Sequence, residues 1–145
     1  MFHKNMSEKK PPQKPTNLRK YDCDLTINHQ HFTKLEISPY YEKHNKEYIE
    51  AQERKGIKLS DQELAEKLIT DDLIRKILLP KLNGEDDIRA DGRNYQYTYY
   101  FAISYKGVKA YKLVWCTSDN ESHILGIMDC FRIRKHDILK KEKTK

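Results

Sequence analysis

The sequence predicts an α+β domain in which two to three N-terminal helices pack on a three- to four-stranded antiparallel sheet, a meander. Two observations predict it. Apolar residues recur at helical spacing before residue 83, whereas from Tyr95 the apolar period changes to two, as in strands with one buried face. Short turns join the later strands, which favours antiparallel neighbours, and helices followed by one half-buried sheet form an α+β arrangement.

The chain length fits a single domain, which we expect to span residues 22–137. Residues 1–20 and 132–145 each carry a net charge of +5, which leaves −4 for the middle of the chain. Residues 1–21 mix prolines with lysines, and we expect a disordered basic tail there and a second basic tail at residues 138–145. Because the basic charge lies in tails, the total of +6 is weak support for nucleic-acid binding.

The sequence shows no signal for a membrane or for export. No apolar run approaches the roughly 20 residues of a membrane span, and the N-terminus lacks the apolar segment of a secretory signal. The three cysteines have no regular spacing, which favours a reducing compartment over a disulfide scaffold. We therefore expect no membrane partner, and action in the cytoplasm, either the cell's own or that of a target cell into which the protein is delivered.

The first expected elements are a weak edge strand and a helix. Alternating apolar residues predict the strand within residues 23–32. The helix begins at Ser38, the expected N-cap, with Pro39 at its first position. It runs to about Lys55, where Gly56 can adopt a left-handed conformation and end it.

A second helix is predicted over residues 60–80. Ser60 and Glu63 have the spacing of a capping box, an apolar stripe follows, and Pro80 ends the pattern. Alternatively, residues 70–72 cap a separate second segment.

The remaining elements are strands. Residues 83–94 predict an acidic loop, and the alternation after it places Tyr97 and Phe101 on the buried face of the first strand. Gly107 can take the positive φ of a tight turn. The three strands of the meander are expected at residues 95–104, 110–115 and 123–135.

His44 raises the first functional question. Each helical residue advances about 100°, which places His44 in an inward-facing stripe with Tyr40, Tyr41 and Tyr48. A buried imidazole must find hydrogen-bond partners. His44 can therefore be a core residue, a catalytic acid or base, or a ligand.

Asp129 is the matching anomaly on the last strand, where it lies between Ile127 and Phe131 on the expected apolar face. A buried carboxylate is costly unless it is paired, so we expect Asp129 to meet His44. Two interpretations stay open: a structural hydrogen bond between helix and sheet, or a histidine oriented by Asp129 for proton transfer. A bulge near Gly126 would reverse the register and remove the basis of both.

Arg132, Arg134 and Lys112 are candidate nucleic-acid-binding residues. The two arginines are expected beside Lys112, on the strand face opposite Asp129. Guanidinium groups with aromatic neighbours suit phosphate binding and base stacking, although an ordinary polar face is the alternative. Because His44 is expected on the other side, the two groups can share a substrate only at an edge of the sheet.

Metal and cofactor signals are weak. His29 and His31 have H-x-H spacing but no firm third ligand, so we expect no metal site and no cofactor. Cys116 and Cys130 are expected to be packing residues. No phosphate-binding glycine loop, zincin motif or nucleophile elbow occurs.

Three segments, YEKHN, ITDDLIRKIL and GIMDCFRIRK, follow one another between residues 38 and 135. In this order they resemble small bacterial ribonuclease toxins of the BrnT/RelE type, in the barnase-EndoU-colicin-RelE-like nuclease group. Lys43 and His44 match the Lys-His pair on the helix of BrnT-like proteins, and Arg132 or Arg134 matches an arginine of the last strand. The chain departs from that pattern by inserting residues 46–68 and by its basic tails.

The resemblance implies metal-independent RNA cleavage by the ribose 2′-hydroxyl, which needs a base, an acid and a cation at the phosphate. His44 would be the acid or base, oriented by Asp129, with Lys43 beside it and Arg132 or Arg134 at the phosphate. RNA and a protein partner such as an antitoxin are the implied partners. The alternative is a non-catalytic interaction module on a nuclease-like fold. An enzyme should have His44 partly exposed beside cations, whereas such a module should bury it.

Overall fold

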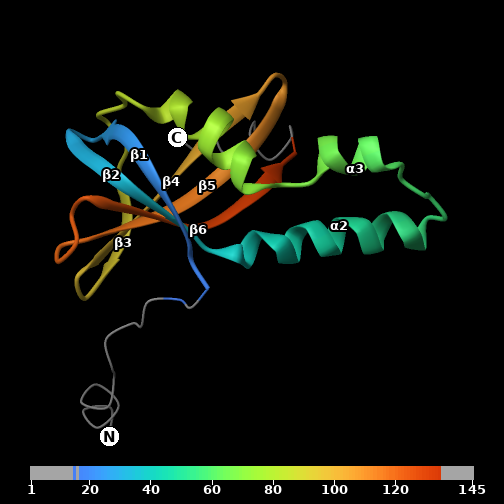
Figure 1. The fold of residues 1–145 in the computed structure, drawn as a ribbon, viewed down its shortest axis with the longest axis horizontal. Coiled ribbons are helices and arrows are strands. Elements are labelled where there is room, and N and C mark those ends of the chain that lie inside the picture. Colours follow the sequence, from blue (N-terminus) through green and yellow to red (C-terminus); the bar gives the residue numbers. More distant parts are fainter. Residues whose placement is uncertain (1–14, 16, 135–145) are drawn as a thin grey trace, which may run out of the picture.

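The computed structural model describes Pro15 and residues 17–134 (Figure 1). Most of the expected basic tail at residues 1–21, and all of the expected tail at residues 138–145, lie outside this range. The first tail was predicted to extend too far, because β1 begins at Arg19. The strands are β1 (Arg19–Ile27), β2 (Gln30–Ile37), β3 (Ala90–Asn94), β4 (Tyr97–Lys106), β5 (Lys109–Ser118) and β6 (Ile124–Ile133). The helices are α2 (Glu42–Arg54) and α3 (Asp61–Lys67), with short helical segments η1 (Pro39–Tyr41), η2 (Leu73–Leu78) and η3 (Pro80–Leu82).

The described strands form one six-stranded mixed sheet in the order β1-β2-β6-β5-β4-β3. The predicted three- to four-stranded antiparallel sheet is therefore wrong. β2 pairs in parallel with β6, and the other neighbours are antiparallel. The prediction failed because the first strand is in fact a hairpin whose second strand docks beside the last strand of the chain. The helices are consequently inserted between strands and are not N-terminal.

Two turns without glycine explain the missed strands. Asn28 and His29 both have positive φ, and they reverse the chain between β1 and β2. Tyr95 also has positive φ, and it lies in the turn that joins β3 to β4. The whole of β3 falls within residues 83–94, which were predicted to be an acidic loop. Non-glycine residues adopt this conformation rarely, so the sequence gives little warning of either turn.

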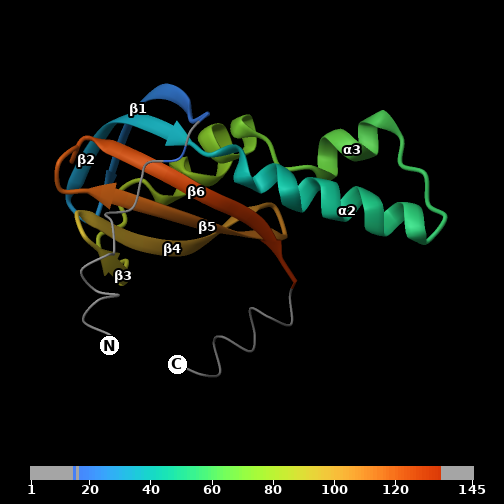
Figure 2. The ribbon, with the colours of Figure 1, turned by 90° about the horizontal axis from the view of Figure 1, so that it is seen from below.

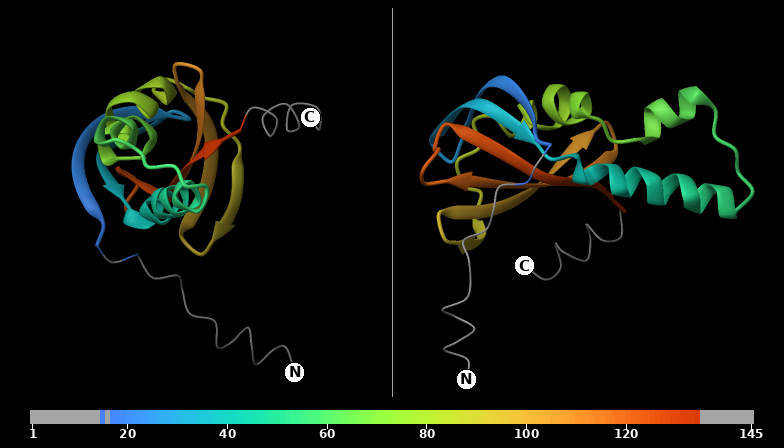
Figure 3. Two further views of the ribbon diagram at one scale, coloured as in Figure 1. Left: turned by 90° about the vertical axis from the view of Figure 1, so that its right-hand side faces the viewer. Right: turned by 60° about the horizontal axis from the view of Figure 1, so that its bottom comes forward.

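One face of the sheet, here called the inner face, packs against residues 69–82 and forms the core. Figure 3 (left) shows the sheet curling around this short helical segment. On β4, Tyr100 stacks on Trp115 with 5.7 Å between ring centroids, and the Ser104 hydroxyl donates to the Leu78 carbonyl at 2.8 Å. Tyr97 and Phe101 are half-buried on the opposite, outer face, so their predicted place in the core is wrong. The core includes Leu25, Ile27, Phe32, Leu35, Ile37, Ile74, Leu78, Leu79, Tyr111, Leu113, Trp115, Leu125 and Ile127.

Asp71 ties β1 to the beginning of the helical region. Its carboxylate accepts hydrogen bonds from Arg19 at 2.6 and 2.8 Å, from Tyr41 at 2.6 Å and from the Tyr21 hydroxyl. Burial alone would raise the pKa of Asp71, but these hydrogen bonds outweigh it and hold the pKa at about 2. Burial and the bond to Asp71 raise the pKa of Tyr41, which keeps this hydroxyl neutral.

Helices α2 and α3 extend together past the end of the sheet (Figures 1 and 2), and neither contains a buried residue. Their ends follow the sequence: the Ser38 hydroxyl caps η1, and the capping box of Ser60 and Glu63 opens α3. The predicted continuous helix over residues 60–80 is wrong, because the backbone is extended at Leu68. The alternative, a separate segment capped by residues 70–72, is confirmed, because the Thr70 hydroxyl accepts a hydrogen bond from the Leu73 backbone N–H.

Candidate active site

His44 and Asp129 are in contact, as expected. The His44 Nε2 atom lies 2.9 Å and 3.0 Å from the two carboxylate oxygens of Asp129. Asp129 Oδ1 also accepts from the Cys130 backbone N–H at 2.8 Å, which fixes the orientation of the carboxylate. The side chains are 29% and 18% exposed, so the pair is accessible to solvent and is not sealed in the core.

The pair forms where β6 loses a neighbouring strand. The pairing of β2 with β6 ends at Ile37 and Ile127, and the Ser38 N–H donates to the Ile127 carbonyl at 2.9 Å. Beyond that point η1 lies beside β6. The first turn of α2 follows directly, and it brings His44 to Asp129.

A β-bulge turns Asp129 to the outer face. Trp115 pairs with Ile127 but Val114 pairs with Asp129, which leaves Met128 as the extra residue. The predicted common apolar face for Ile127 and Asp129 is therefore wrong. The contact with His44 survives because α2 reaches the outer side of β6 at this point.

The hydrogen bond fixes the tautomer of the imidazole. A carboxylate accepts hydrogen bonds and does not donate them, so Nε2 carries the proton that bonds to Asp129. Nδ1 of a neutral His44 then carries the lone pair. An imidazole held in this way can accept a proton at Nδ1, and the carboxylate stabilises the resulting cation.

Aromatic rings and lysines surround the pair. The His44 ring lies 5.9 Å from the Tyr40 ring and 5.5 Å from the Phe131 ring, centroid to centroid. Lys43 Nζ lies 5.7 Å from the Tyr40 centroid, and Lys112 Nζ lies 5.9 Å from the Phe131 centroid. Each lysine therefore lies near an aromatic ring that neighbours His44, and Lys112 lies closer still to Phe101, 4.0 Å from its centroid.

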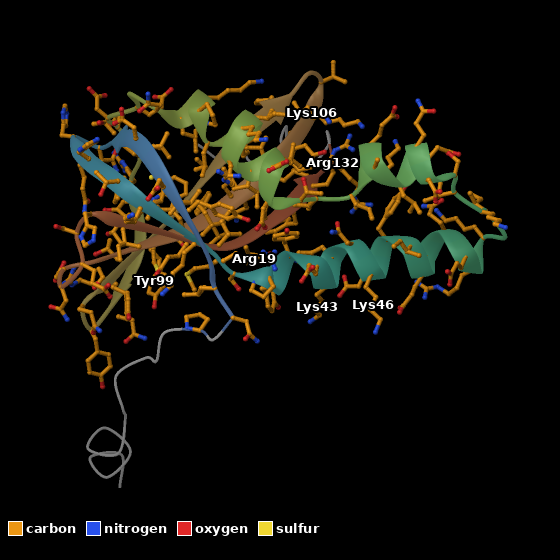
Figure 4. The ribbon with its side chains drawn as sticks, in the orientation of Figure 1. Arg19, Lys43, Lys46, Tyr99, Lys106 and Arg132 are labelled. Carbon is orange, nitrogen blue, oxygen red and sulfur yellow. The ribbon has the colours of Figure 1, made fainter. Side chains whose placement is uncertain are left out.

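The predicted grouping of Lys112 with the strand arginines is wrong. Lys112 pairs with Phe131 and lies on the outer face with Asp129, whereas Arg132 pairs with Tyr111 of the inner face and lies 5.9 Å from that ring. Figure 4 shows Lys43 on the side of α2 away from Arg132. Arg134 is exposed just after the end of β6. Because of the bulge, Lys112 and not Arg132 is the cation on the face of His44 and Asp129.

The outer face also contains a pocket of about 170 Å³, here called the Tyr99 pocket. Its floor is a row of paired residues that crosses three strands from Tyr99 through Cys116 to Gly126 and continues to Glu36 on β2. The residues that line it include Glu36, Ser38, Tyr97, Tyr99, Cys116 and Met128. Sequence reasoning missed this pocket; a glycine within the last strand is the signal that could have indicated it.

His29 and His31 contact different carboxylates, and Cys130 is a buried packing residue. His29 lies in the β1–β2 turn, 3.7 Å from Asp86, whereas His31 contacts Asp24 at 2.6 Å. Within the described residues, no three His, Cys, Asp or Glu side chains are grouped as metal ligands would be. Burial raises the pKa of the Cys130 thiol to about 12, which suits a packing residue.

Comparisons with known proteins found no matching family model, no matching curated protein and no matching solved structure. Among the described helices, none has the length and apolar character needed to cross a membrane.

Proposed function

We propose that this protein is a ribonuclease that cleaves RNA by acid/base chemistry without a metal ion. One observation carries the proposal: His44 is bonded to Asp129 and remains partly exposed on a face that also presents aromatic rings and lysines. Exposed rings suit base stacking, and lysines suit contacts with phosphate.

In the proposed reaction, His44 Nδ1 takes the proton of a ribose 2′-hydroxyl, and Asp129 stabilises the imidazolium that forms. The 2′-oxygen bonds to phosphorus while the bond to the 5′-oxygen breaks. Lys43 donates a proton to that leaving oxygen, and Lys112 neutralises charge on the phosphate. The products are a 2′,3′-cyclic phosphate and a 5′-hydroxyl. Exchange with water then removes the extra proton from His44 and returns one to Lys43. For an RNA substrate we propose a cytoplasmic site of action, in the cell itself or in a target cell.

A second candidate function is a non-catalytic module that binds a protein partner, such as an antitoxin. The observation that favours it is the arm formed by α2 and α3, which has no buried residue and exposes Ile57 at 45%. The partial exposure of His44 beside cations favours the enzyme over this alternative.

The test incubates the purified protein with single-stranded and structured RNA, with and without a chelator, and identifies the new ends by mass spectrometry. We expect cleavage that is unaffected by the chelator and yields 2′,3′-cyclic phosphate ends. Loss of cleavage with the chelator would contradict the metal-free chemistry. Folded protein that leaves every RNA intact would favour the interaction module.

A further inference from the structure

We infer that Asn45 is a positioning residue for His44: its side-chain amide fastens the first turn of α2 to the backbone of Ile69, and this attachment holds the imidazole against Asp129. The inference deepens the proposed ribonuclease function and rests on it for the effect on cleavage. The attachment and the contact between His44 and Asp129 are both present in the structure.

Asn45 bonds to both main-chain polar groups of Ile69. Its Nδ2 atom donates to the Ile69 carbonyl at 2.8 Å, and its Oδ1 atom accepts from the Ile69 N–H at 2.8 Å. A side-chain amide has a carbonyl oxygen and an NH₂ group, so it can pair with a peptide backbone as a neighbouring strand does. Two bonds to one residue fix the direction of the side chain as well as its distance.

Ile69 is a firm attachment point, because it is only 5% exposed and belongs to the core. It lies between α3 and η2, outside the described helices and strands. A buried backbone N–H and C=O need partners, and in such a segment these come from elsewhere in the chain. Asn45 provides both, and it thereby joins α2 to residues 69–82, which pack on the inner face of the sheet.

The attachment is important because burial does little to hold α2. None of its residues is buried, and the helix extends past the end of the sheet (Figure 2). Just before α2, the buried Tyr41 donates to Asp71 at 2.6 Å. His44 therefore lies between two attachments to the same segment: it follows the one at Tyr41 and directly precedes the one at Asn45.

His44 and Asn45 leave the same turn in different directions. Successive helical residues are about 100° apart, so His44 reaches Asp129 on β6 while Asn45 reaches Ile69. If this turn were free to pivot, the distances of 2.9 and 3.0 Å between Nε2 and the carboxylate oxygens would lengthen. A misplacement of about 1 Å in an active site can cost about 100-fold in rate.

A second asparagine makes the same pair of bonds and provides a matched control. Asn28 Nδ2 donates to the Ile88 carbonyl at 2.7 Å, and its Oδ1 accepts from the Ile88 N–H at 2.9 Å. Asn28 lies in the β1–β2 turn, at the opposite end of β2 from α2, and it has a positive φ that glycine tolerates. Asn28→Gly therefore removes an equivalent pair of bonds without touching α2.

The experiment records the imidazole nitrogen NMR signals of the full-length protein labelled with ¹⁵N-histidine, at about pH 8.5, where an ordinary imidazole is neutral. His44→Gln identifies the His44 signals. In wild type we expect Nε2 at the position of a protonated nitrogen and Nδ1 at that of an unprotonated one, because Asp129 selects this tautomer. Asn45→Ala should move both signals toward the average of the two tautomers, and Asn28→Gly should leave them in place.

The same proteins are then assayed for RNA cleavage. Asn45→Ala should lose about tenfold or more in kcat with KM unchanged, because Asn45 acts on the geometry of His44 and not on the binding of RNA. Asn28→Gly should cleave as fast as wild type.

The outcomes separate this inference from the proposed function. His44 signals that stay in place in Asn45→Ala, or that move equally in Asn28→Gly, would overturn the inference whether or not the protein cleaves RNA, and so would an undiminished kcat in Asn45→Ala. Averaged signals in a protein that leaves all RNA intact would support the positioning role and contradict the ribonuclease. Should Asn45→Ala fail to fold, Asn45→Asp provides the same test, because it still accepts from the Ile69 N–H but cannot donate to the Ile69 carbonyl.

Discussion

Replacing Asp71 by Asn should destabilise the protein in a pH-dependent way. The pKa of Asp71 is lowered from 3.8 to about 2 in the folded protein, because the bonds from Arg19, Tyr21 and Tyr41 outweigh the opposing effect of burial. A depressed carboxyl pKa stabilises the fold above the unfolded pKa, and that stabilisation is lost as the pH falls toward the folded pKa. The difference of nearly two pKa units corresponds to about 2 kcal/mol.

The assay is urea unfolding between pH 7 and pH 2, followed by the fluorescence of Trp115, the only tryptophan. At pH 7 we expect Asp71→Asn to lower the free energy of unfolding by about 2 kcal/mol or more, since the amide keeps only one acceptor oxygen and two of the four hydrogen bonds to the carboxylate lose their acceptor. The difference in the free energy of unfolding between wild type and Asp71→Asn should become smaller as the pH falls from 4 to 2. Asp72→Asn, at the exposed neighbouring position, is the control. A difference in unfolding free energy that stays constant with pH would refute this reasoning.

The remaining predictions concern the two faces of the sheet and the arm. Leu113→Ala should cost about 2–5 kcal/mol in urea unfolding, because Leu113 is fully buried, and Phe101→Ala on the outer face should cost less; equal losses would contradict the assignment of the faces. RNA binding measured at several salt concentrations gives the slope of the logarithm of the binding constant against the logarithm of the salt concentration. Lys112→Ala should reduce this slope by about 1, and Arg132→Ala should leave it unchanged. A reduced slope for Arg132→Ala alone would place the RNA on the inner face. Ser60→Ala should cost about 0.5–2 kcal/mol in the arm, seen as faster amide exchange in α3, and unchanged exchange would show that the capping box is dispensable.

Local signals in the sequence predicted local structure. The cap at Ser38 and the capping box at Ser60 are confirmed, and so are the positive φ angles of Gly56 and Gly107. Each depends on residues within one turn of the chain, where side-chain chemistry decides the conformation.

Long-range pairing was not predictable in the same way. The parallel pairing of β2 with β6 joins residues about 90 positions apart, and no local pattern encodes it. On β4, tyrosines occur on both faces, so alternation alone could not identify Tyr100 as the inner residue.

The candidate site was predicted in part. The contact between His44 and Asp129 is confirmed, because an acid and an imidazole among apolar residues each require a partner. The bulge at Met128 reversed the assignment of everything after it, including Cys130 and Arg132. A bulge adds one residue to a strand, so every side chain after it lies on the other face of the sheet. The pattern of apolar and polar residues in the sequence looks the same with or without the bulge.

The most direct test of the central claim is the rate of RNA cleavage by His44→Gln, measured beside wild type and His123→Gln, a control at an exposed histidine away from the site. Circular dichroism and unfolding should first show that all three proteins are folded. We expect His44→Gln to lose at least 100-fold in rate, the lower end of what general acid–base catalysis contributes, while His123→Gln cleaves as fast as wild type. Cleavage that survives His44→Gln undiminished would contradict the account and leave His44 as a structural partner of Asp129.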